Sequence, residues 1–86
     1  MTATRTVQLV NKRGLHARAS AKFVTLASEL PGPVEVEKDG HKVVGTSIMG
    51  LMMLGAAKGD SVTISGEDAD AVSKLAALVE DGFGED

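Results

Sequence analysis

The fold is indicated most strongly by the stretch Val34-Glu35-Val36-Glu37-Lys38-Asp39-Gly40-His41-Lys42-Val43-Val44. Its first four residues alternate between valine and glutamate, with the period of two that a half-buried strand shows. Asp39-Gly40 is a pair that tolerates the positive φ angles of a type I′ turn. We therefore expect a β-hairpin in which residues 34–37 form one strand and residues 41–44 return as the next.

The residues before the hairpin predict a strand followed by a helix. Residues 5–10 alternate in hydropathy, which places Val7 and Leu9 on one face. After a loop at 11–14 the apolar spacing becomes helical from about His16, and the sequence Pro-Gly-Pro at 31–33 ends the helix. The expected apolar stripe of this helix consists of Ala19, Phe23, Leu26, Ala27 and Leu30.

The residues after the hairpin predict a helix, a strand and a final helix. Thr46-Ser47 offers a hydroxyl cap for a short helix through residues 48–54, with Gly55 near its end. Residues 61–65 alternate again, with Val62 and Ile64 inward. The last helix has an apolar stripe made of Val72, Leu75, Ala76 and Val79. We expect the tail at 82–86 to be loosely held.

The order of elements, β-α-β-β-α-β-α, favours the α+β class. It predicts a two-layer sandwich in which the helices cover one face of a mainly antiparallel, four-stranded sheet, and it leaves the strand order open. With 86 residues, the chain is expected to form a single domain, 1–86, with a modest core and little room for an enclosed cavity. That length favours a surface site serving other proteins over an enzyme with a deep pocket.

Charge is divided unevenly along the chain. Residues 1–28 contain five basic side chains and no acidic one, whereas all twelve acidic residues lie in 29–86. The five basic residues are Arg5, Lys12, Arg13, Arg18 and Lys22. Such a distribution predicts an electropositive face suited to an anionic ligand or to a partner's acidic surface. The alternative is a chance cluster of solvated side chains.

A histidine stands at the predicted start of the first helix, in the stretch Gly14-Leu15-His16-Ala17-Arg18-Ala19-Ser20. The unpaired N–H groups and the positive dipole end of a helix bind phosphate. A neutral imidazole is a nucleophile toward phosphorus, and its phosphoramidate product can pass the group onward. Arg18 can offset charge during such a transfer. The alternative is a histidine that only caps the helix or lies on the surface.

The second predicted helix is apolar on nearly every side, although a short helix on a sheet can hide only one. Helical spacing turns Leu51 and Leu54 toward the core. The side chains left partly outward are Ile48, Met49, Met52 and Met53. Exposed methionine suits contact with several partners, and the alternative is that these residues fill the core. Ser47 is either only the helix cap or a site where an added phosphate would place negative charge beside apolar side chains.

Two motifs carry a resemblance to a known family. They are residues 14–18, which read Gly-Leu-His-Ala-Arg, and residues 47–55, which read Ser-Ile-Met-Gly-Leu-Met-Met-Leu-Gly. In this order and at this separation they are similar to those of HPr, the histidine phosphocarrier family of the bacterial phosphoenolpyruvate-dependent phosphotransferase system. The resemblance covers essentially the whole length. It implies an open-faced sandwich with strand order 1-4-2-3 and three helices on one side.

By the same resemblance, the chain is a phosphoryl carrier with a transient phosphohistidine and not an enzyme. His16 would accept the group on Nδ1 from enzyme I and hand it to an enzyme IIA domain, in sugar uptake or nitrogen-type regulation. Arg18 and the backbone of Ala17 and Arg18 would hold the phosphoryl group. The implied docking surface consists of Ile48, Met49 and Met52, together with Ala21 and Lys22.

Ser47 matches the position that HPr kinase/phosphorylase modifies in many relatives. This leaves a second function open, that of a regulatory protein-binding module controlled by phosphorylation at Ser47. Ala19 stands where sugar-transport members often have proline, and residues 82–86 read Gly-Phe-Gly-Glu-Asp. These two features resemble the nitrogen-related branch of the family, called NPr.

Composition weighs against several other kinds of site. The chain has no cysteine, which excludes disulfides and thiolate metal sites, and two distant histidines, His16 and His41, do not make a metal site. We expect no cofactor. No stretch approaches membrane-spanning length, so we expect a cytoplasmic monomer.

Two functions from other classes are left as alternatives. A phosphoesterase acting through a phosphohistidine would need a base to position water, and no acidic residue lies near His16 in the sequence. An RNA-binding module would need stacking platforms, but the only aromatic residues are two phenylalanines, and the acidic remainder would repel a phosphate backbone.

Overall fold

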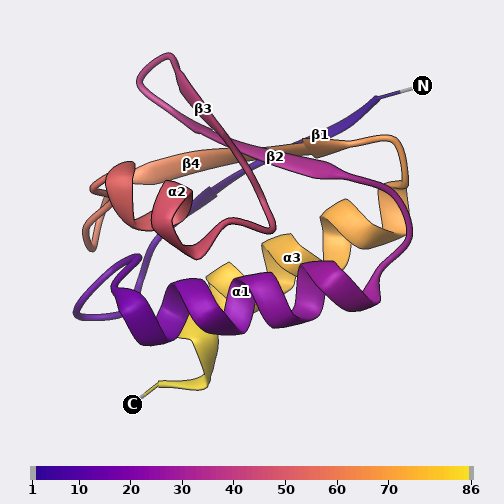
Figure 1. The fold of residues 1–86 in the computed structure, drawn as a ribbon. Helices are drawn as coiled ribbons and strands as arrows, with labels where there is room; N and C mark the ends of the chain where they lie inside the picture. The colour runs from indigo at the N-terminus through magenta and orange to yellow at the C-terminus, as the bar shows by residue number, and fades with distance from the viewer. Residues whose placement is uncertain (1, 86) are drawn as a thin grey trace.

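The computed structural model describes residues 2–85, which form one antiparallel sheet with α-helices on one of its faces (Figure 1). The described elements are β1 (Ala3–Gln8), α1 (Ala17–Glu29), β2 (Val34–Lys38), β3 (His41–Val44), α2 (Ile48–Met53), β4 (Ser61–Gly66), α3 (Ala69–Glu80) and a 3-10 turn at Gly82–Gly84. The predicted order of elements is confirmed. None of the helices within residues 2–85 is long and apolar enough to cross a membrane.

The sheet has four strands in the order β1-β4-β2-β3, and every neighbouring pair is antiparallel. The α+β sandwich predicted from the pattern and the strand order implied by the resemblance are therefore both confirmed. Asp39 and Gly40 have φ angles of 51° and 82°, and Lys38 pairs with His41 across the turn. The hairpin predicted from these residues is the one that forms.

The core lies between the sheet and the helices. The inward residues of three neighbouring strands, Val7, Val62 and Val36, are all nearly inaccessible to solvent. In α1 the predicted stripe is buried at Ala19, Phe23 and Ala27, whereas Leu26 and Leu30 are only partly buried at its edge. The predicted stripe of α3, Val72, Leu75, Ala76 and Val79, is buried throughout.

The tail after α3 is not loosely held over the residues that the structure describes, so that expectation was wrong for 82–85. Phe83 is only 1% exposed, with a left-handed φ of 59°, and it belongs to the main core. The Lys22 ammonium donates a hydrogen bond of 2.8 Å to the Phe83 carbonyl. The buried ring of Phe83, the hydrogen bond from Lys22 and the hydrogen bond from Asn11 to Glu85 together offset the entropy of ordering these residues. Asp86 lies outside the described residues.

Removing this anchor should destabilise the whole protein. We expect Phe83→Ala to lower the free energy of unfolding by about 3 kcal/mol or more, because the substitution empties a fully buried site. Urea denaturation followed by circular dichroism measures the change. Met53→Ala, at a side chain that is 79% exposed, should cost about 0.5 kcal/mol or less. Equal effects of the two substitutions would show that the tail does not pack as described.

Candidate functional site

His16 is the N-cap residue of α1, and its ring takes part in the cap. The backbone of His16 is extended (φ −74°, ψ −179°), and Nδ1 accepts a hydrogen bond of 3.0 Å from the Ala19 N–H. A side-chain acceptor at this position satisfies one of the N–H groups that the first helical turn leaves unpaired. The side chain is 21% exposed, so the ring is partly open to solvent.

The hydrogen bond to Nδ1 determines which nitrogen carries the proton of the neutral ring. A nitrogen that accepts a hydrogen bond must hold a lone pair, so the proton of the neutral imidazole lies on Nε2. Nε2 is 3.1 Å from Oε2 of Glu85. The two atoms are close, but the N–H of the ring is not aligned well enough with Oε2 for a hydrogen bond. Oε2 has no hydrogen-bond partner within the described residues. The ring thus presents a nucleophilic Nδ1 on one edge and faces a carboxylate with the other.

The surroundings of Nδ1 are suited to an anion. A shallow hollow at the start of α1 is lined by Arg13, His16, Ala17 and Arg18. The N–H groups of Ala17 and Arg18 make no hydrogen bond within residues 2–85, as expected for the first residues of a helix. The Arg18 side chain is exposed, and no carboxylate of residues 2–85 forms an ion pair with it. The structure therefore brings together the predicted residues His16, Ala17 and Arg18.

The loop that leads to His16 is held by a close approach of Gly14 to the segment after α2. The Leu15 N–H donates to the Ala56 carbonyl at 2.9 Å. Gly14 has a φ of +61°, and a Cβ at this position would overlap the Ala56 carbonyl oxygen and crowd Ala57. Only glycine satisfies both conditions, because it has no Cβ and adopts positive φ freely.

We expect Gly14→Ala to lower the free energy of unfolding by about 2–4 kcal/mol, because the new methyl group meets backbone and cannot be accommodated by a rotamer change. Gly55→Ala is the matched control. Gly55 also has positive φ (+66°), but nothing lies within 4 Å of its virtual Cβ, so the cost should be about 1 kcal/mol. Urea denaturation of both variants gives the difference. Equal costs would mean that the close approach is not needed.

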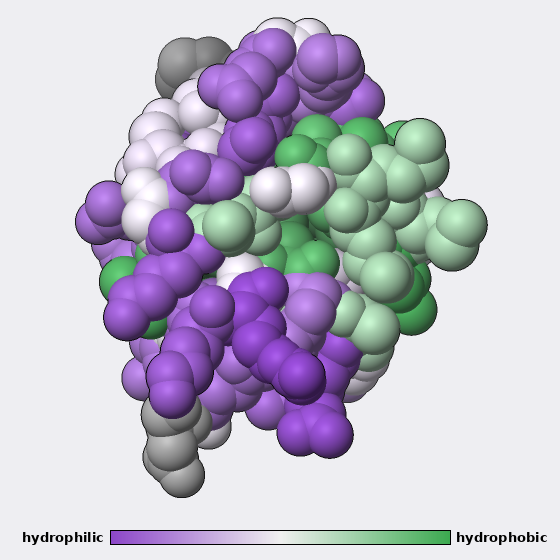
Figure 2. All heavy atoms as spheres, turned by 90° about the vertical axis from the view of Figure 1, so that its left-hand side faces the viewer, coloured by the Kyte–Doolittle hydropathy of each residue, from purple (hydrophilic) through white to green (hydrophobic). Residues whose placement is uncertain are grey.

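The predicted apolar surface lies beside the start of α1. Leu51 and Leu54 face inward as expected, whereas Met49 is 70% exposed and Met53 79% exposed. Ile48 and Met52 are 40% and 42% exposed. α1 and α2 pack against each other, and the start of α1 and the helix α2 lie on the same side of the molecule (Figure 1). Viewed from that side, the surface shows a continuous apolar area that borders a hydrophilic one (Figure 2).

The other predicted residues lie close to these two surfaces. Ser47 is the N-cap residue of α2, and its Oγ accepts a hydrogen bond of 2.9 Å from the Gly50 N–H, which confirms the capping role. Ala21 is half-buried in α1. Lys22 is exposed, but its ammonium already donates to the Phe83 carbonyl. His41 is exposed in β3, away from the other histidine.

Two residues beside His16 were missed by sequence reasoning, namely Asn11 and Glu85. Asn11 is 5% exposed, and its side-chain amide donates to the Gly14 carbonyl at 2.8 Å and to Oε1 of Glu85 at 3.1 Å. The argument that no acidic residue lies near His16 holds along the chain but fails in space. The sequence carries no local signal for Glu85, because its position depends on the burial of Phe83, which brings the end of the chain to the start of α1.

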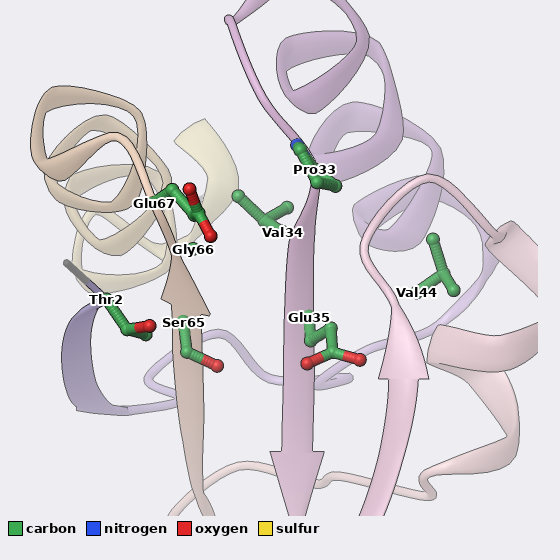
Figure 3. Close-up of a pocket in the computed structure, with 8 residues that line it drawn as sticks. All are labelled: Thr2, Pro33, Val34, Glu35, Val44, Ser65, Gly66 and Glu67. Carbon is green, nitrogen blue, oxygen red and sulfur yellow. The ribbon is translucent and has the colours of Figure 1, made fainter.

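A second hollow lies at the opposite end of the sheet. Figure 3 shows its lining residues at the ends of β4, β2 and β3, among them Ser65, Glu35 and Val44. Pro33, which also lines this hollow, follows the end of α1, so the hollow lies about 20 Å from His16 along that helix. Among the described residues that line it there is no histidine and no basic side chain, so they offer no positive charge for an anion.

Residues 3–81 match the family model described as PTS HPr component phosphorylation site. The phosphocarrier protein HPr of Neisseria meningitidis serogroup A is 46% identical over 82 residues, which cover 92% of each chain. The phosphocarrier protein NPr of Shewanella violacea is 39% identical over 84 residues, covering 94% of this chain and 92% of the relative.

An HPr-like relative and a solved structure are also similar to the chain. The HPr-like protein Crh of Bacillus subtilis is 46% identical over 78 residues, covering 87% of this chain and 92% of Crh. A crystal structure of HPr from Thermoanaerobacter tengcongensis superposes with a TM-score of 0.91 at 42% identity, covering 98% of both chains.

Proposed function

Because the chain belongs to the HPr family of phosphocarrier proteins, we propose that His16 receives a phosphoryl group from enzyme I and passes it to an enzyme IIA domain. The observation that supports this most is the position of Nδ1, which holds a lone pair and accepts a hydrogen bond from the first turn of α1. Relatives named HPr and NPr are both similar to the chain. Sugar uptake and nitrogen-type regulation would use the same transfer step.

Nδ1, and not Nε2, is the acceptor in this proposal because of what faces each nitrogen. Nε2 lies against the Glu85 carboxylate, which would repel a phosphoryl group. Nδ1 lies at the start of a helix, where the unpaired N–H groups of Ala17 and Arg18 and the Arg18 guanidinium favour negative charge. The electrostatics of the two edges of the ring therefore differ in sign.

In the transfer step the Nδ1 lone pair forms a bond to phosphorus, and the bond between phosphorus and the donor breaks with its electron pair leaving on the donor. The ring keeps its Nε2 proton and gains a positive charge, so no proton needs to be removed. The Ala19 N–H, which loses its acceptor when Nδ1 is phosphorylated, becomes free to donate to a phosphoryl oxygen together with Ala17 and Arg18. Release to the next protein reverses these changes.

We propose that the protein is a carrier and not a hydrolase because of where the carboxylate of Glu85 lies. A hydrolase would need a base that positions water behind the phosphorus bonded to Nδ1. Glu85 contacts the opposite nitrogen, and its side chain is only 18% exposed. It therefore does not lie where such a water would approach.

The test of the proposed site replaces the nucleophile and keeps the cap. We expect His16→Asn to accept no acid-labile, base-stable phosphate from phosphoenolpyruvate and enzyme I, because asparagine caps a helix but cannot form a phosphoramidate in this way. His41→Asn should accept the label like the unchanged protein, since His41 is an exposed strand residue. Retention of the label by His16→Asn would place the phosphoryl group elsewhere.

We also propose that Ser47 allows regulation of the same surface. Its hydroxyl caps α2 directly before the exposed side chains of Ile48 and Met49, which the family resemblance makes part of the docking surface. A phosphate on Ser47 would suit the helix dipole but would add negative charge to an apolar contact. The chain is similar to the HPr-like protein Crh of Bacillus subtilis, which a solved structure describes as a catabolite repression protein, and this similarity supports a regulatory role.

Two substitutions separate the effect of a negative charge at position 47 from the effect of the helix cap. Aspartate and asparagine both cap helices well, but only aspartate adds charge. We expect Ser47→Asp to lower kcat/KM for phosphorylation by enzyme I by about tenfold, mainly through KM, because a desolvated charge weakens docking. Ser47→Asn should stay close to the unchanged protein. Equal rates for both variants would rule out docking beside Ser47.

A further inference from the structure

We infer that Glu85 is a positioning residue for the transfer step, whose carboxylate stabilises the phosphorylated form of His16 through Nε2. This inference rests on the proposed function of His16 and deepens it. It concerns a part of the chain beyond residues 3–81, over which the family model matches.

The carboxylate is held in place from both sides. Oε1 accepts a hydrogen bond of 3.1 Å from the Asn11 side-chain amide, which also donates to the Gly14 carbonyl and so ties the carboxylate to the loop before α1. Oε2 lies 3.1 Å from Nε2 of His16 and has no other partner within residues 2–85. An unpaired carboxylate oxygen with little access to solvent is costly unless it faces positive charge.

That positive charge arises when His16 is phosphorylated. The neutral ring that attacks carries its proton on Nε2, and the new bond to phosphorus leaves a cationic ring with the same proton. The carboxylate then lies 3.1 Å from a nitrogen of a cationic ring, and this Coulomb attraction is stronger than its contact with the neutral ring. When the group leaves, the electron pair of the phosphorus–nitrogen bond returns to Nδ1, and the ring is again neutral with its proton on Nε2.

The carboxylate also repels the phosphoryl group, but this effect is the smaller one. Glu85 contacts the edge of the ring that faces away from Nδ1, so phosphorus lies farther from it than the cationic ring does. The phosphoryl group is also more open to solvent and lies beside Arg13 and Arg18, which line the same hollow. Attraction at 3.1 Å therefore outweighs the more distant, better screened repulsion.

The tail is built so that Glu85 reaches this position. Phe83 is buried in the core, and the Lys22 ammonium holds the Phe83 carbonyl at 2.8 Å. The Glu85 N–H donates to the Gly82 carbonyl at 3.0 Å, which closes the turn before the carboxylate. The buried Phe83 ring and the hydrogen bond from Lys22 thus fix a side chain whose only described polar partners are Asn11 and His16.

The test compares two substitutions that each remove one negative charge near the end of the chain. Glu85→Gln removes the charge beside Nε2. Glu80→Gln is the matched control, because Glu80 is exposed and its carboxylate forms an ion pair only with Arg5, at 3.8 Å, among the described residues. The measured quantity is the equilibrium ratio of phosphorylated to free protein with enzyme I, phosphoenolpyruvate and pyruvate. We expect this ratio to fall about fivefold to tenfold in Glu85→Gln and to stay unchanged in Glu80→Gln.

A pH profile distinguishes an electrostatic role from a structural one. Arg13, Arg18 and Glu85 are the charged groups that face the ring in the described structure, and Glu85 is the one that favours a protonated Nε2. Without it, the phosphorylated ring should lose its proton at lower pH. The midpoint of the hydrolysis profile of the phosphohistidine should therefore move down by up to about one pH unit in Glu85→Gln and not in Glu80→Gln.

One readout needs no phosphorylation and separates this inference from the proposed function. In the unphosphorylated protein the ¹⁵N resonance of Nε2 should move in Glu85→Gln and stay in place in Glu80→Gln. If the unchanged protein takes the label on His16 but both variants behave alike, the inference about Glu85 is wrong and the proposed function stands. If the Nε2 resonance moves but His16 takes no label, the contact exists and the proposed function is wrong.

Discussion

The site depends on one close contact between two backbone segments. Gly14 lies so near the Ala56 carbonyl that a side chain would not fit, and the next residue, Leu15, is hydrogen-bonded to the same carbonyl. This contact sets the residue at which α1 can begin, and therefore where the imidazole of His16 lies. It also joins the start of α1 to the segment after α2, so that the helix carrying the exposed methionines lies on the same side of the molecule as the start of α1. The proposed nucleophile and the proposed docking surface are thereby placed on one side of a small protein.

The hydrogen bond that orients His16 is also the one that the proposed transfer must break. A helix cap contributes about 1 kcal/mol, which is small beside the free energy of forming a phosphoramidate bond. The Ala19 N–H loses Nδ1 and can donate to the phosphoryl group in its place, so the cost of breaking the cap is largely offset. Such an exchange of one acceptor for another suits a group that must be taken up and released repeatedly.

Local sequence patterns predicted the structure correctly where it depends on residues that are close together in the chain. Asp39-Gly40 predicted the hairpin because its φ angles are intrinsic to the pair, and His16 was placed at a helix start because the apolar spacing changes there. The exposure of Met49 and Met53 followed from the limited area that a short helix can hide. The contact between His16 and Glu85 could not be predicted, since it depends on Phe83 burying its ring far along the chain. A phenylalanine between two glycines does not reveal that it is an anchor.

The central claim is that the phosphoryl group supplied by enzyme I becomes bonded to Nδ1 of His16. The most direct measurement is a one-bond coupling between ³¹P and the ring nitrogens of ¹⁵N-labelled protein, recorded after incubation with enzyme I and phosphoenolpyruvate. The account predicts a coupling to Nδ1, together with a shift of the Ala19 amide resonance as its acceptor changes. A coupling to Nε2, or a phosphorylated protein with both ring nitrogens uncoupled, would contradict it.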